Sequence, residues 1–331
     1  MVKIIDEIKE KAKSDIKRIV LPEALDIRVL TAAAEAQKEG IAKVILLGDE
    51  AKIEKLAKEE GLDITEVEII NPVTSERYNE YVNGLYELRK EKGMTIEKAT
   101  ELVKDEIYYG VLMVKFGHAD GLVCGAIHST ADTLRPALQI VKTRPGAKCV
   151  SSCVLLEVPD SRYGFEYIFA DCGLIQKPTA EELSEIAIAS NDTYKQLVGG
   201  TPKLAMLSYS THGSAKAEEI DTVTTAMGLV KEKREDIIID GELQLDAALD
   251  KNVAKLKAPN SKVAGEANVL IFPNLEAGNI GYKLVERLGN GTAYGPITQG
   301  LAKPINDLSR GCKAKDIVGA IAITAVQASE K

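Results

Sequence analysis

The chain has 331 residues, 45% of them hydrophobic, so it can bury a large core, and this length is more typical of two domains than of one. Its formal net charge of -8 argues against the basic surface of nucleic-acid-binding proteins, so an anionic ligand must meet local basic groups. No run approaches the roughly 20 apolar residues of a membrane span. Residues 1–21 mix Lys and Glu into an amphipathic helix that leads to a strand, unlike a signal peptide. We therefore expect a cytoplasmic protein.

Cysteine and histidine usage points away from disulfides and metals. The five cysteines are an odd number without CxxC spacing, as expected in a reducing compartment, and four of them lie among apolar neighbours and are expected to be buried. The five are Cys124, Cys149, Cys153, Cys172 and Cys312. The histidines are far apart and form no HxxxH cluster, so we predict structural or solvated roles for His118, His128 and His212. No metal and no redox cofactor is predicted.

Short β-rich runs alternate with helical patterns almost from end to end, which is typical of a parallel sheet with helices on its faces. We predict strands, in chain order, at residues 19–22, 43–48, 121–124, 204–208, 237–240 and 269–272. Apolar periods near 3.6 predict helices over residues 28–38, 179–197, 215–230 and 277–288. The predicted fold class is therefore α/β, with two parallel-sheet lobes.

One stretch breaks this alternation and suggests where the lobes divide. Residues 147–158 and 164–170 are both β-type and are joined by residues 159–162, which predicts a hairpin. Pro145 and Gly146 interrupt the chain just before it, so we place the first boundary there and the second near residues 294–296. The first lobe would contain residues 1–144 plus 297–331, and the second residues 145–296. The segment after Pro296 would then lie beside the cleft between the lobes.

Three junctions between strand and helix carry small polar residues, where free backbone N–H groups could bind an anion. They are residues 124–130, 207–214 and 306–312. Each signal is weak alone, because Ser and Thr also cap helices for structural reasons. The first two junctions give Ser129, Thr130, Gly213 and Ser214 as candidate ligand-binding residues.

The third junction brings a hydroxyl (Ser309), a guanidinium (Arg310), a glycine and a carboxylate (Asp316) within eight residues. Asp316 should lie in or near the first turn of the helix that starts near Lys313. The structural alternative is that Asp316 stabilises the helix dipole and that Arg310 pairs with a surface carboxylate. Neither GxxxxGK[ST] nor GxGxxG opens a helix after a strand, so ATP hydrolysis and Rossmann-type dinucleotide binding lack their usual motif.

Many separated segments, in order, resemble those of the phosphate acetyltransferases along essentially the whole chain. They include LPEALDIR at residues 21–28, YELRK at 86–90, TADTLRPALQ at 130–139, ADCG at 170–173, LSYST at 207–211, 267–268 through 281–284, and NDLSRG at 306–311. So many ordered matches are far more specific than any one motif.

This resemblance implies two lobes of the isocitrate and isopropylmalate dehydrogenase type, a homodimer, and coenzyme A bound in the interlobe cleft as a substrate. By position, Asp316 matches the family's base for the coenzyme A thiol, Ser309 the hydroxyl that stabilises the tetrahedral intermediate, and Arg310 the arginine for the acyl phosphate. Basic positions for coenzyme A or the phosphoryl substrate are matched by Arg28, Arg89, Arg135 and Arg287. The other partners would be acetyl phosphate and inorganic phosphate, with neither nucleic acid nor membrane.

Other functions compete with this one. A phosphate butyryltransferase would use the same scheme with a wider acyl pocket. A non-catalytic acetyl coenzyme A sensor, like the related domain of some malic enzymes, is disfavoured by the intact set of Ser309, Arg310 and Asp316. A decarboxylating dehydrogenase would require metal-binding aspartates and a nicotinamide site, and neither is visible. An acetyl-thioester on Cys312 is disfavoured because no His lies nearby in sequence to activate the thiol.

Overall fold

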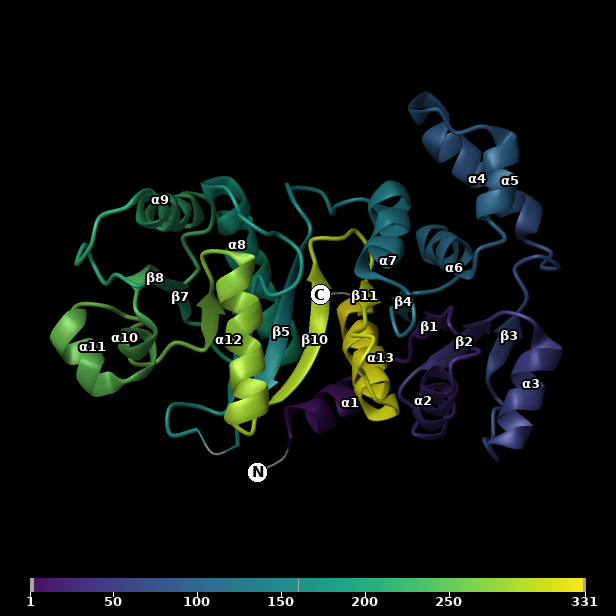
Figure 1. Cartoon of the computed structure of the whole chain (residues 1–331), viewed down its shortest axis with the longest axis horizontal. Helices are drawn as coiled ribbons and strands as arrows, with labels where there is room; N and C mark the ends of the chain where they lie inside the picture. Colours follow the sequence, from purple (N-terminus) through teal and green to yellow (C-terminus); the bar gives the residue numbers. More distant parts are fainter. Residues whose placement is uncertain (1–2, 160, 330–331) are drawn as a thin grey trace. The chain divides into compact units, whose positions relative to one another are not determined.

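The computed structural model describes residues 3–159 and 161–329, which form two compact units (Figure 1). Unit 1 comprises Met1–Pro145 and Leu301–Lys331, and unit 2 comprises Gly146–Gly300. The chain returns to unit 1 after Gly300, a few residues beyond Pro296, because the last strand of unit 2 continues through Gln299. Asp160, in the predicted hairpin turn, lies outside the described residues. None of the helices that the structure describes combines the length and the apolar character required to cross a membrane.

Unit 1 is built on a parallel sheet. Its elements are α1 (Ile4–Ser14), β1 (Arg18–Leu21), α2 (Ile27–Lys38), β2 (Lys43–Leu47), α3 (Glu50–Glu59), β3 (Glu68–Ile70), α4 (Tyr78–Arg89), the 3-10 helix η1 (Lys90–Lys92), α5 (Ile96–Leu102), α6 (Glu106–Lys115), β4 (Gly121–Cys124), α7 (Thr130–Pro136), the π-helix η2 (Ala137–Val141), β11 (Ile305–Asp307) and α13 (Ala314–Ala328). The strand order is β11-β4-β1-β2-β3, and every pair is parallel.

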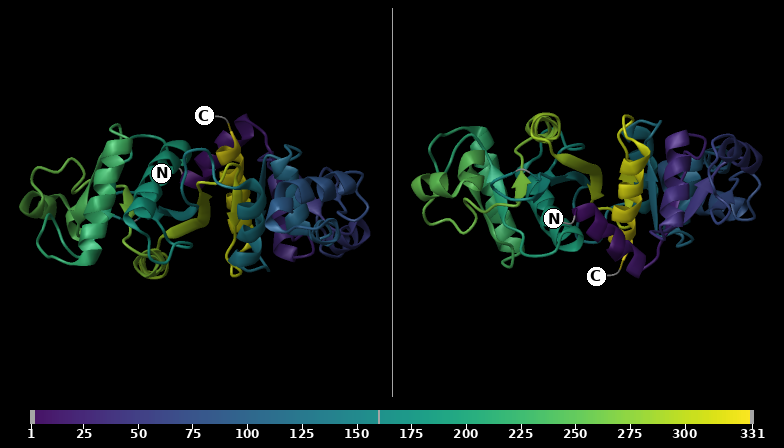
Figure 2. Two further views of the ribbon diagram at one scale, coloured as in Figure 1. Left: turned by 90° about the horizontal axis from the view of Figure 1, so that it is seen from above. Right: turned by 90° about the horizontal axis from the view of Figure 1, so that it is seen from below.

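Helices cover both faces of this sheet, as its almost wholly buried central strands require. On one face α13 contacts α1, α2, β1 and β4 (Figure 2). On the other face, α6 approaches closely at Gly110, where a side chain would meet Leu122, Val20 and Leu47. The core on this side continues through α4, with Tyr81 fully buried.

Unit 2 contains a mixed sheet. Its elements are β5 (Ser151–Glu157), β6 (Glu166–Ala170), α8 (Ala180–Leu197), β7 (Leu204–Leu207), α9 (Glu218–Lys233), β8 (Ile239–Leu243), α10 (Leu245–Leu249), α11 (Lys251–Lys257), β9 (Val269–Ile271), α12 (Leu275–Leu288) and β10 (Thr292–Gln299). The order is β10-β5-β6-β9-β7-β8, in which β10, β5 and β6 pair antiparallel and the remaining pairs are parallel.

Most predicted elements occur close to their predicted bounds, and the predicted hairpin is confirmed as the antiparallel pair of β5 and β6. The helix predicted from residue 215 begins only at Glu218, because Ala217 before it has an extended backbone (φ -165°, ψ 160°). The strand predicted at residues 237–240 lies at Ile239–Leu243 instead. The pattern missed β3, β10 and β11.

The topology of unit 1 determines which loops can meet. Strands β11, β4 and β1 are adjacent and parallel, so their carboxyl ends lie at one edge of the sheet. Three segments therefore gather at this edge: the one that begins at Glu23, the loop after Cys124 and the loop after Asp307.

Candidate active site

The loop after β4 is organised around a buried carboxylate, that of Glu23. One Glu23 oxygen accepts the backbone N–H groups of Gly125 and Ala126 at 2.9 and 2.7 Å, and the other accepts those of Ile127 and His128, both at 3.0 Å. The His128 Nδ1 lies 2.8 Å from Glu23 Oε1. The Glu23 side chain is only 1% exposed. The free N–H groups that the sequence suggested for an external anion are thus bonded to a side chain of the protein.

The loop after β11 presents the predicted catalytic set. Ser309 and Arg310 are exposed, and among the described residues the Arg310 guanidinium has no hydrogen-bond or ion-pair partner. The Ser309 hydroxyl accepts only a 3.3 Å bond from the Gly311 N–H. Asp316 is half-buried in the first turn of α13, and its Oδ2 accepts the Lys313 N–H at 2.8 Å. The loop therefore offers a hydroxyl and an unpaired cation close in sequence to a helix-capping carboxylate.

Arg28, which the resemblance assigns to an anionic substrate, bonds to groups of the protein itself. Its Nε and Nη2 bind the two oxygens of Asp26 at 3.0 and 2.8 Å. Its remaining donors reach backbone carbonyls: Nη2 that of Ala126 at 2.8 Å, and Nη1 those of Arg310 at 2.8 Å and Cys312 at 3.1 Å. The bond to Arg28 holds the pKa of the Asp26 carboxyl below its usual range.

The two loops are also joined directly. The Thr130 hydroxyl donates to Asp307 Oδ2 at 2.6 Å, and the Leu308 N–H donates to the Cys124 carbonyl at 2.7 Å. Asp307 is 4% exposed, and burial raises the pKa of its carboxyl. Ser129 caps α7, because its hydroxyl accepts the Asp132 N–H at 3.3 Å.

Two other predicted arginines lie near one another in unit 1. Arg89 at the end of α4 and Arg135 on α7 both act on Tyr108 of α6, where their positive charges offset part of the rise in the pKa of the phenol that burial causes. Arg89 is half-buried, and its Nε is buried without a hydrogen-bond partner among the described residues. Arg135 is 59% exposed and lies 3.6 Å from Asp132. Burying an N–H donor without an acceptor costs free energy, so the Arg89 Nε is available to donate to a bound ligand.

In unit 2, polar groups of the predicted loop at residues 207–214 bond to one another and to Glu242. Glu242, 3% exposed, accepts the Ser210 hydroxyl at 2.8 Å and the Gly213 N–H at 2.7 Å. The Ser214 hydroxyl accepts the Thr211 N–H at 3.1 Å. Gly213 has open space on its side-chain side, so a ligand could approach its backbone closely. Arg287, on α12, is 79% exposed and lies 3.7 Å from Glu286.

The histidines have structural partners. His118 Nδ1 lies 2.7 Å from the Tyr81 hydroxyl, and His212 Nε2 lies 3.3 Å from Asp240. Within residues 3–159 and 161–329, no three His, Cys, Asp or Glu side chains are grouped so that they could hold a metal ion. All five cysteines are free thiols; four are buried, as many as predicted, and Cys149 is partly exposed.

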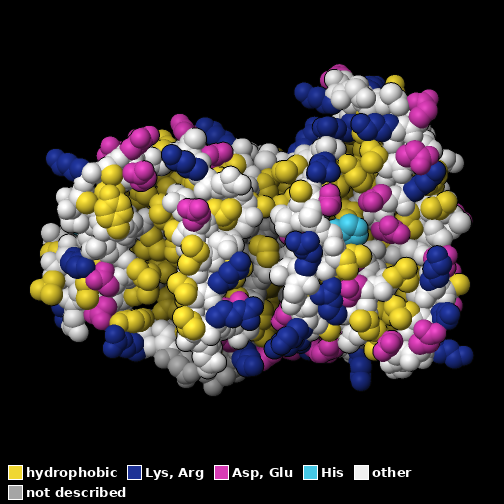
Figure 3. Space-filling model, viewed as in Figure 1, with side chains coloured by type: hydrophobic (Ala, Val, Ile, Leu, Met, Phe, Trp, Pro, Cys, Tyr) yellow, Lys and Arg dark blue, Asp and Glu magenta, His cyan; other side chains and the backbone are white. Residues whose placement is uncertain are grey.

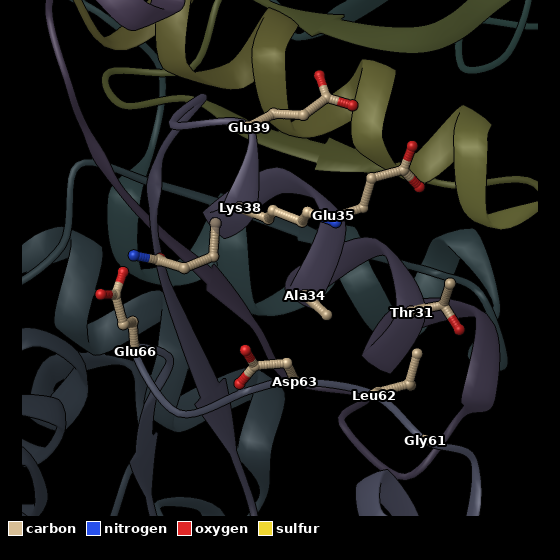
Figure 4. A pocket seen from close by; sticks show the side chains of 10 residues that line it. Thr31, Ala34, Glu35, Lys38, Glu39, Gly61, Leu62, Asp63 and Glu66 are labelled. Carbon is tan, nitrogen blue, oxygen red and sulfur yellow. The ribbon is translucent and has the colours of Figure 1, made fainter.

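A groove of about 880 Å³ on unit 1 has mostly acidic charged side chains in its lining and is therefore unsuitable for an anion. It lies between the second half of α2 and the loop before β3, and Figure 4 shows four carboxylates around it. They belong to Glu35, Glu39, Asp63 and Glu66, with Lys38 as the cation among the lining residues. This surplus of negative charge would repel a phosphate ester.

Residues 3–325 match the model of a family described as phosphate acetyl/butaryl transferase. The chain belongs to this family. A phosphate acetyltransferase of Thermoanaerobacterium thermosaccharolyticum is 59% identical over 327 residues, which cover 98% of this chain and 99% of its own. The crystal structure of a phosphotransacetylase from Streptococcus pyogenes matches with a TM-score of 0.93 and 45% identity over 98% of both chains. The resemblance found in the sequence is confirmed.

The expected relation to dehydrogenases is confirmed at the level of the fold. A protein from Salmonella typhimurium described as a 4-hydroxythreonine-4-phosphate dehydrogenase matches with a TM-score of 0.55 and 11% identity, over 95% of this chain and 99% of its own. At that identity the match shows the fold alone. The phosphate acetyl/butaryl transferase chain thus shares the α/β architecture that the sequence predicted.

Sequence reasoning missed the buried acids of this phosphate acetyl/butaryl transferase. Glu23 and Asp307 each join segments more than a hundred residues apart, and Glu242 holds a loop from the neighbouring strand. No local pattern marks such a residue. The available signal for Glu23 was its place directly after a buried parallel strand, which is where polar residues of α/β proteins gather.

Proposed function

We propose that this chain is a phosphate acetyltransferase that transfers an acetyl group between acetyl phosphate and coenzyme A, with both substrates bound together. The observation that supports it most is the loop after β11. This loop exposes the Ser309 hydroxyl, and it exposes the Arg310 guanidinium, for which the described part of the chain offers no hydrogen-bond or ion-pair partner. Relatives named phosphate acetyltransferase, such as the one that is 59% identical, support the same activity.

In the proposed reaction, the coenzyme A sulfur attacks the carbonyl carbon of acetyl phosphate. A carbon–sulfur bond forms, the bond from that carbon to the bridging oxygen breaks, and phosphate leaves with the electron pair. The thiol proton passes to the Asp316 carboxylate. Binding both substrates side by side removes the entropic cost of approach, so no acetyl-enzyme is required.

The proton transfer needs help from positive charge. Proton transfer from a thiol with a reference pKa of ~8.5 to a free carboxyl group with a reference pKa of ~3.9 costs about 6 kcal/mol, so a carboxylate by itself is a weak acceptor. A cation beside the sulfur would lower the thiol pKa and narrow the gap. Arg310, in the same loop, has a guanidinium with no hydrogen-bond or ion-pair partner among the described residues.

Ser309 and Arg310 take the remaining roles. Negative charge grows on the acetyl oxygen during attack, and the Ser309 hydroxyl would donate to it, an interaction typically worth about 10² to 10³ in rate. The Arg310 guanidinium offers paired donors to the phosphate, which suits the planar fork of arginine better than a lysine. Phosphate is a stable leaving group, so no acid is assigned to it.

For coenzyme A, we propose three arginines that have bonding capacity left. Arg89 has a buried Nε without a described partner, and the Arg135 and Arg287 guanidinium groups are exposed. Polar contacts are assigned to Ser129, Thr130, Gly213 and Ser214. No metal and no redox cofactor enter the scheme.

The proposal includes a homodimer. Ile280, Leu284 and Leu288 recur at four-residue intervals on α12 and are 58%, 52% and 82% exposed. Figure 3 shows hydrophobic side chains over the region where Figure 1 labels α12. Such a stripe is suited to a second copy of the chain. Sedimentation should give a dimer, and Leu284→Glu should give a monomer; a wild-type monomer would contradict this.

We also propose a cytoplasmic location, which the free thiols of all five cysteines support because disulfides form readily outside the reducing cytosol. Recovery of the native protein in a secreted fraction, without lysis, would contradict it.

One assay tests the activity. The purified protein is mixed with coenzyme A and acetyl, propionyl or butyryl phosphate, and thioester absorbance is followed. We expect the fastest turnover with acetyl phosphate. Preference for butyryl phosphate would favour the butyryltransferase alternative, and failure with all three would overturn the transferase proposal.

A further inference from the structure

We propose that Glu23 and Arg28 are positioning residues that together hold the two loops of the site, and we call the pair the Glu23–Arg28 clamp. The clamp lies entirely within unit 1. The inference rests on the proposed function, because it concerns the loop that contains Ser309 and Arg310.

Glu23 supplies the first half of the clamp. Its carboxylate accepts four consecutive backbone N–H groups, of residues 125–128, at 2.7 to 3.0 Å. Successive N–H groups that converge on one point form an anion-binding nest. Here the nest contains the carboxylate of Glu23, whose side chain is 1% exposed. The loop after β4 therefore has a fixed shape before any substrate arrives.

Arg28 supplies the second half. A guanidinium has five N–H donors, and all five of Arg28 are used: two on Asp26 and one each on the carbonyls of Ala126, Arg310 and Cys312. Ala126 bonds to both side chains: its N–H donates to Glu23, and its carbonyl accepts from Arg28. The two side chains thus act on one shared residue.

The clamp connects to the chemistry through the carbonyls of Arg310 and Cys312. These flank Gly311, which is exposed. Without Arg28, this short segment would keep the Cys312 N–H bond to the Ser309 carbonyl at 2.9 Å, but residues 310–312 would lose their own link to the loop after β4, which would then be joined only at Asp307 and Leu308. The direction of the Arg310 side chain depends on that link.

The competing role for Arg28 is direct binding of a coenzyme A phosphate. For this, the guanidinium would have to leave at least one carbonyl and expose an acceptor that it now satisfies. Its side chain is 28% exposed, and its partner Asp26 only 13%. The two roles predict different kinetics, because a phosphate contact affects coenzyme A alone, whereas the clamp affects the acyl-phosphate side.

The first experiment uses full-length Arg28→Ala and Arg28→Lys. For Arg28→Ala we expect kcat to fall by about 10², as for a slightly misplaced site, with a higher KM for acetyl phosphate. The KM for coenzyme A should stay within about threefold, and the preference for coenzyme A over 3′-dephospho-coenzyme A should not change. Millimolar guanidinium should restore part of the activity, and Arg28→Lys should lie between Arg28→Ala and wild type.

The matched control is Arg234→Ala in unit 2, which removes an arginine bonded to Asp192 and Asp236. Its kinetics should not change, and guanidinium should not increase its activity. If Arg28→Ala instead raises the KM for coenzyme A alone and abolishes discrimination against 3′-dephospho-coenzyme A, Arg28 binds the phosphate and the clamp is wrong.

The second experiment tests Glu23. Glu23→Ala should lower kcat by about as much as Arg28→Ala, and formate, a carboxylate small enough for the vacated nest, should restore activity. Glu23→Gln should not respond to formate, because its side chain still fills the nest. The control, Glu185→Ala, removes a partly buried acid bonded to Lys233 at 2.8 Å and should ignore formate. Loss of kcat in Glu23→Ala without formate rescue, in a protein whose thermal midpoint matches that of wild type, would overturn the clamp.

These outcomes are separable from the proposed function. If the wild-type protein shows no transferase activity with any acyl phosphate, the proposed function fails. If the wild type is active and the variants behave as phosphate-contact mutants, only the clamp fails.

Discussion

In both units a buried carboxylate accepts hydrogen bonds from a loop that follows a parallel strand: Glu23 in unit 1 accepts backbone N–H groups, and Glu242 in unit 2 accepts the Gly213 N–H and the Ser210 hydroxyl. The loops differ in which polar side chains remain available to a ligand. In unit 2 the hydroxyls of Ser210 and Ser214 bond within the loop and to Glu242. In unit 1 the loop after β11 leaves the Arg310 guanidinium without a partner within residues 3–159 and 161–329.

This difference separates two tasks. A loop whose polar groups bond to one another is rigid and can shape a binding surface, but it has little left to stabilise a developing charge. A loop that is held by its backbone, through Arg28, leaves its side chains for substrate. Catalysis benefits from donors that are fixed in place before the reaction. We therefore assign the chemistry to unit 1 and a supporting role to the unit 2 loop.

The strongest test of this assignment is Asp316→Asn. We expect turnover to fall by about 10² to 10⁴, as for loss of a positioned base, with coenzyme A binding nearly unchanged. The amide oxygen of Asn can still accept the Lys313 N–H, so the start of α13 should persist. Steady-state kinetics and calorimetric binding of coenzyme A measure the two effects.

The matched control for Asp316 is Glu182→Gln, at the corresponding position of the capping box that starts α8 in unit 2. It should leave turnover within about twofold of wild type, because a helix cap contributes to stability alone. If Asp316→Asn is equally mild, Asp316 is only a cap, and unit 1 loses its proposed base.

Arg310 should give the next largest effect. Arg310→Gln removes the cation, and we expect turnover to fall by about 10² to 10³ with a higher KM for acetyl phosphate. Arg310→Lys keeps the charge but loses the paired donors, so it should be less severe. Coenzyme A affinity should change little in both. A strong loss of coenzyme A affinity with an unchanged KM for acetyl phosphate would place this arginine on the other substrate.

Glu242→Ala probes the unit 2 side of the comparison. Loss of the acceptor leaves the Gly213 N–H unpaired and removes one bond of the Ser210 hydroxyl, which should destabilise the protein by about 1 to 3 kcal/mol. We expect a lower thermal midpoint and a higher KM for coenzyme A, with kcat changed only a few-fold. If kcat falls as far as in Arg310→Gln, the loop of unit 2 shares directly in the chemistry.

The sequence predicts the elements of this fold where local patterns are strong. β4 is a short, wholly buried apolar run, and α8 has an N-cap Thr179 followed by Glu182 and a long apolar period, so both were found. β11 was missed because Ile305–Asp307 contains Asn and Asp, which are rare in strands. Asn306 is buried with its side-chain amide donating to Thr324 and Gln327 of α13 at 2.8 and 2.6 Å, partners that lie 18 and 21 positions further along the chain.

The same limit applies to the site. Ser309, Arg310 and Asp316 are close in sequence, so a motif could identify them. Arg28 is an arginine near the start of a helix, as Arg310 is. Two of the carbonyls that it binds, however, lie about a hundred and nearly three hundred positions away in the sequence. Only the order of strands β11, β4 and β1 brings these segments together, and local periodicity carries no information on strand order.

The smallest effect is expected from Cys312→Ala. Burial raises the pKa of the Cys312 thiol, although Arg28 Nη1, 4.0 Å from its sulfur, acts in the opposite direction. The thiol is therefore protonated at neutral pH and a poor nucleophile. Its backbone carbonyl, which accepts from Arg28, is kept in the alanine variant, so the loop should hold its shape. We expect turnover within a few-fold of wild type, and no radiolabelled acetyl group on wild-type protein after acid quench. Stoichiometric acetyl-protein that disappears in Cys312→Ala would replace direct transfer with a covalent intermediate, and the unit 1 loop would then contain the nucleophile itself.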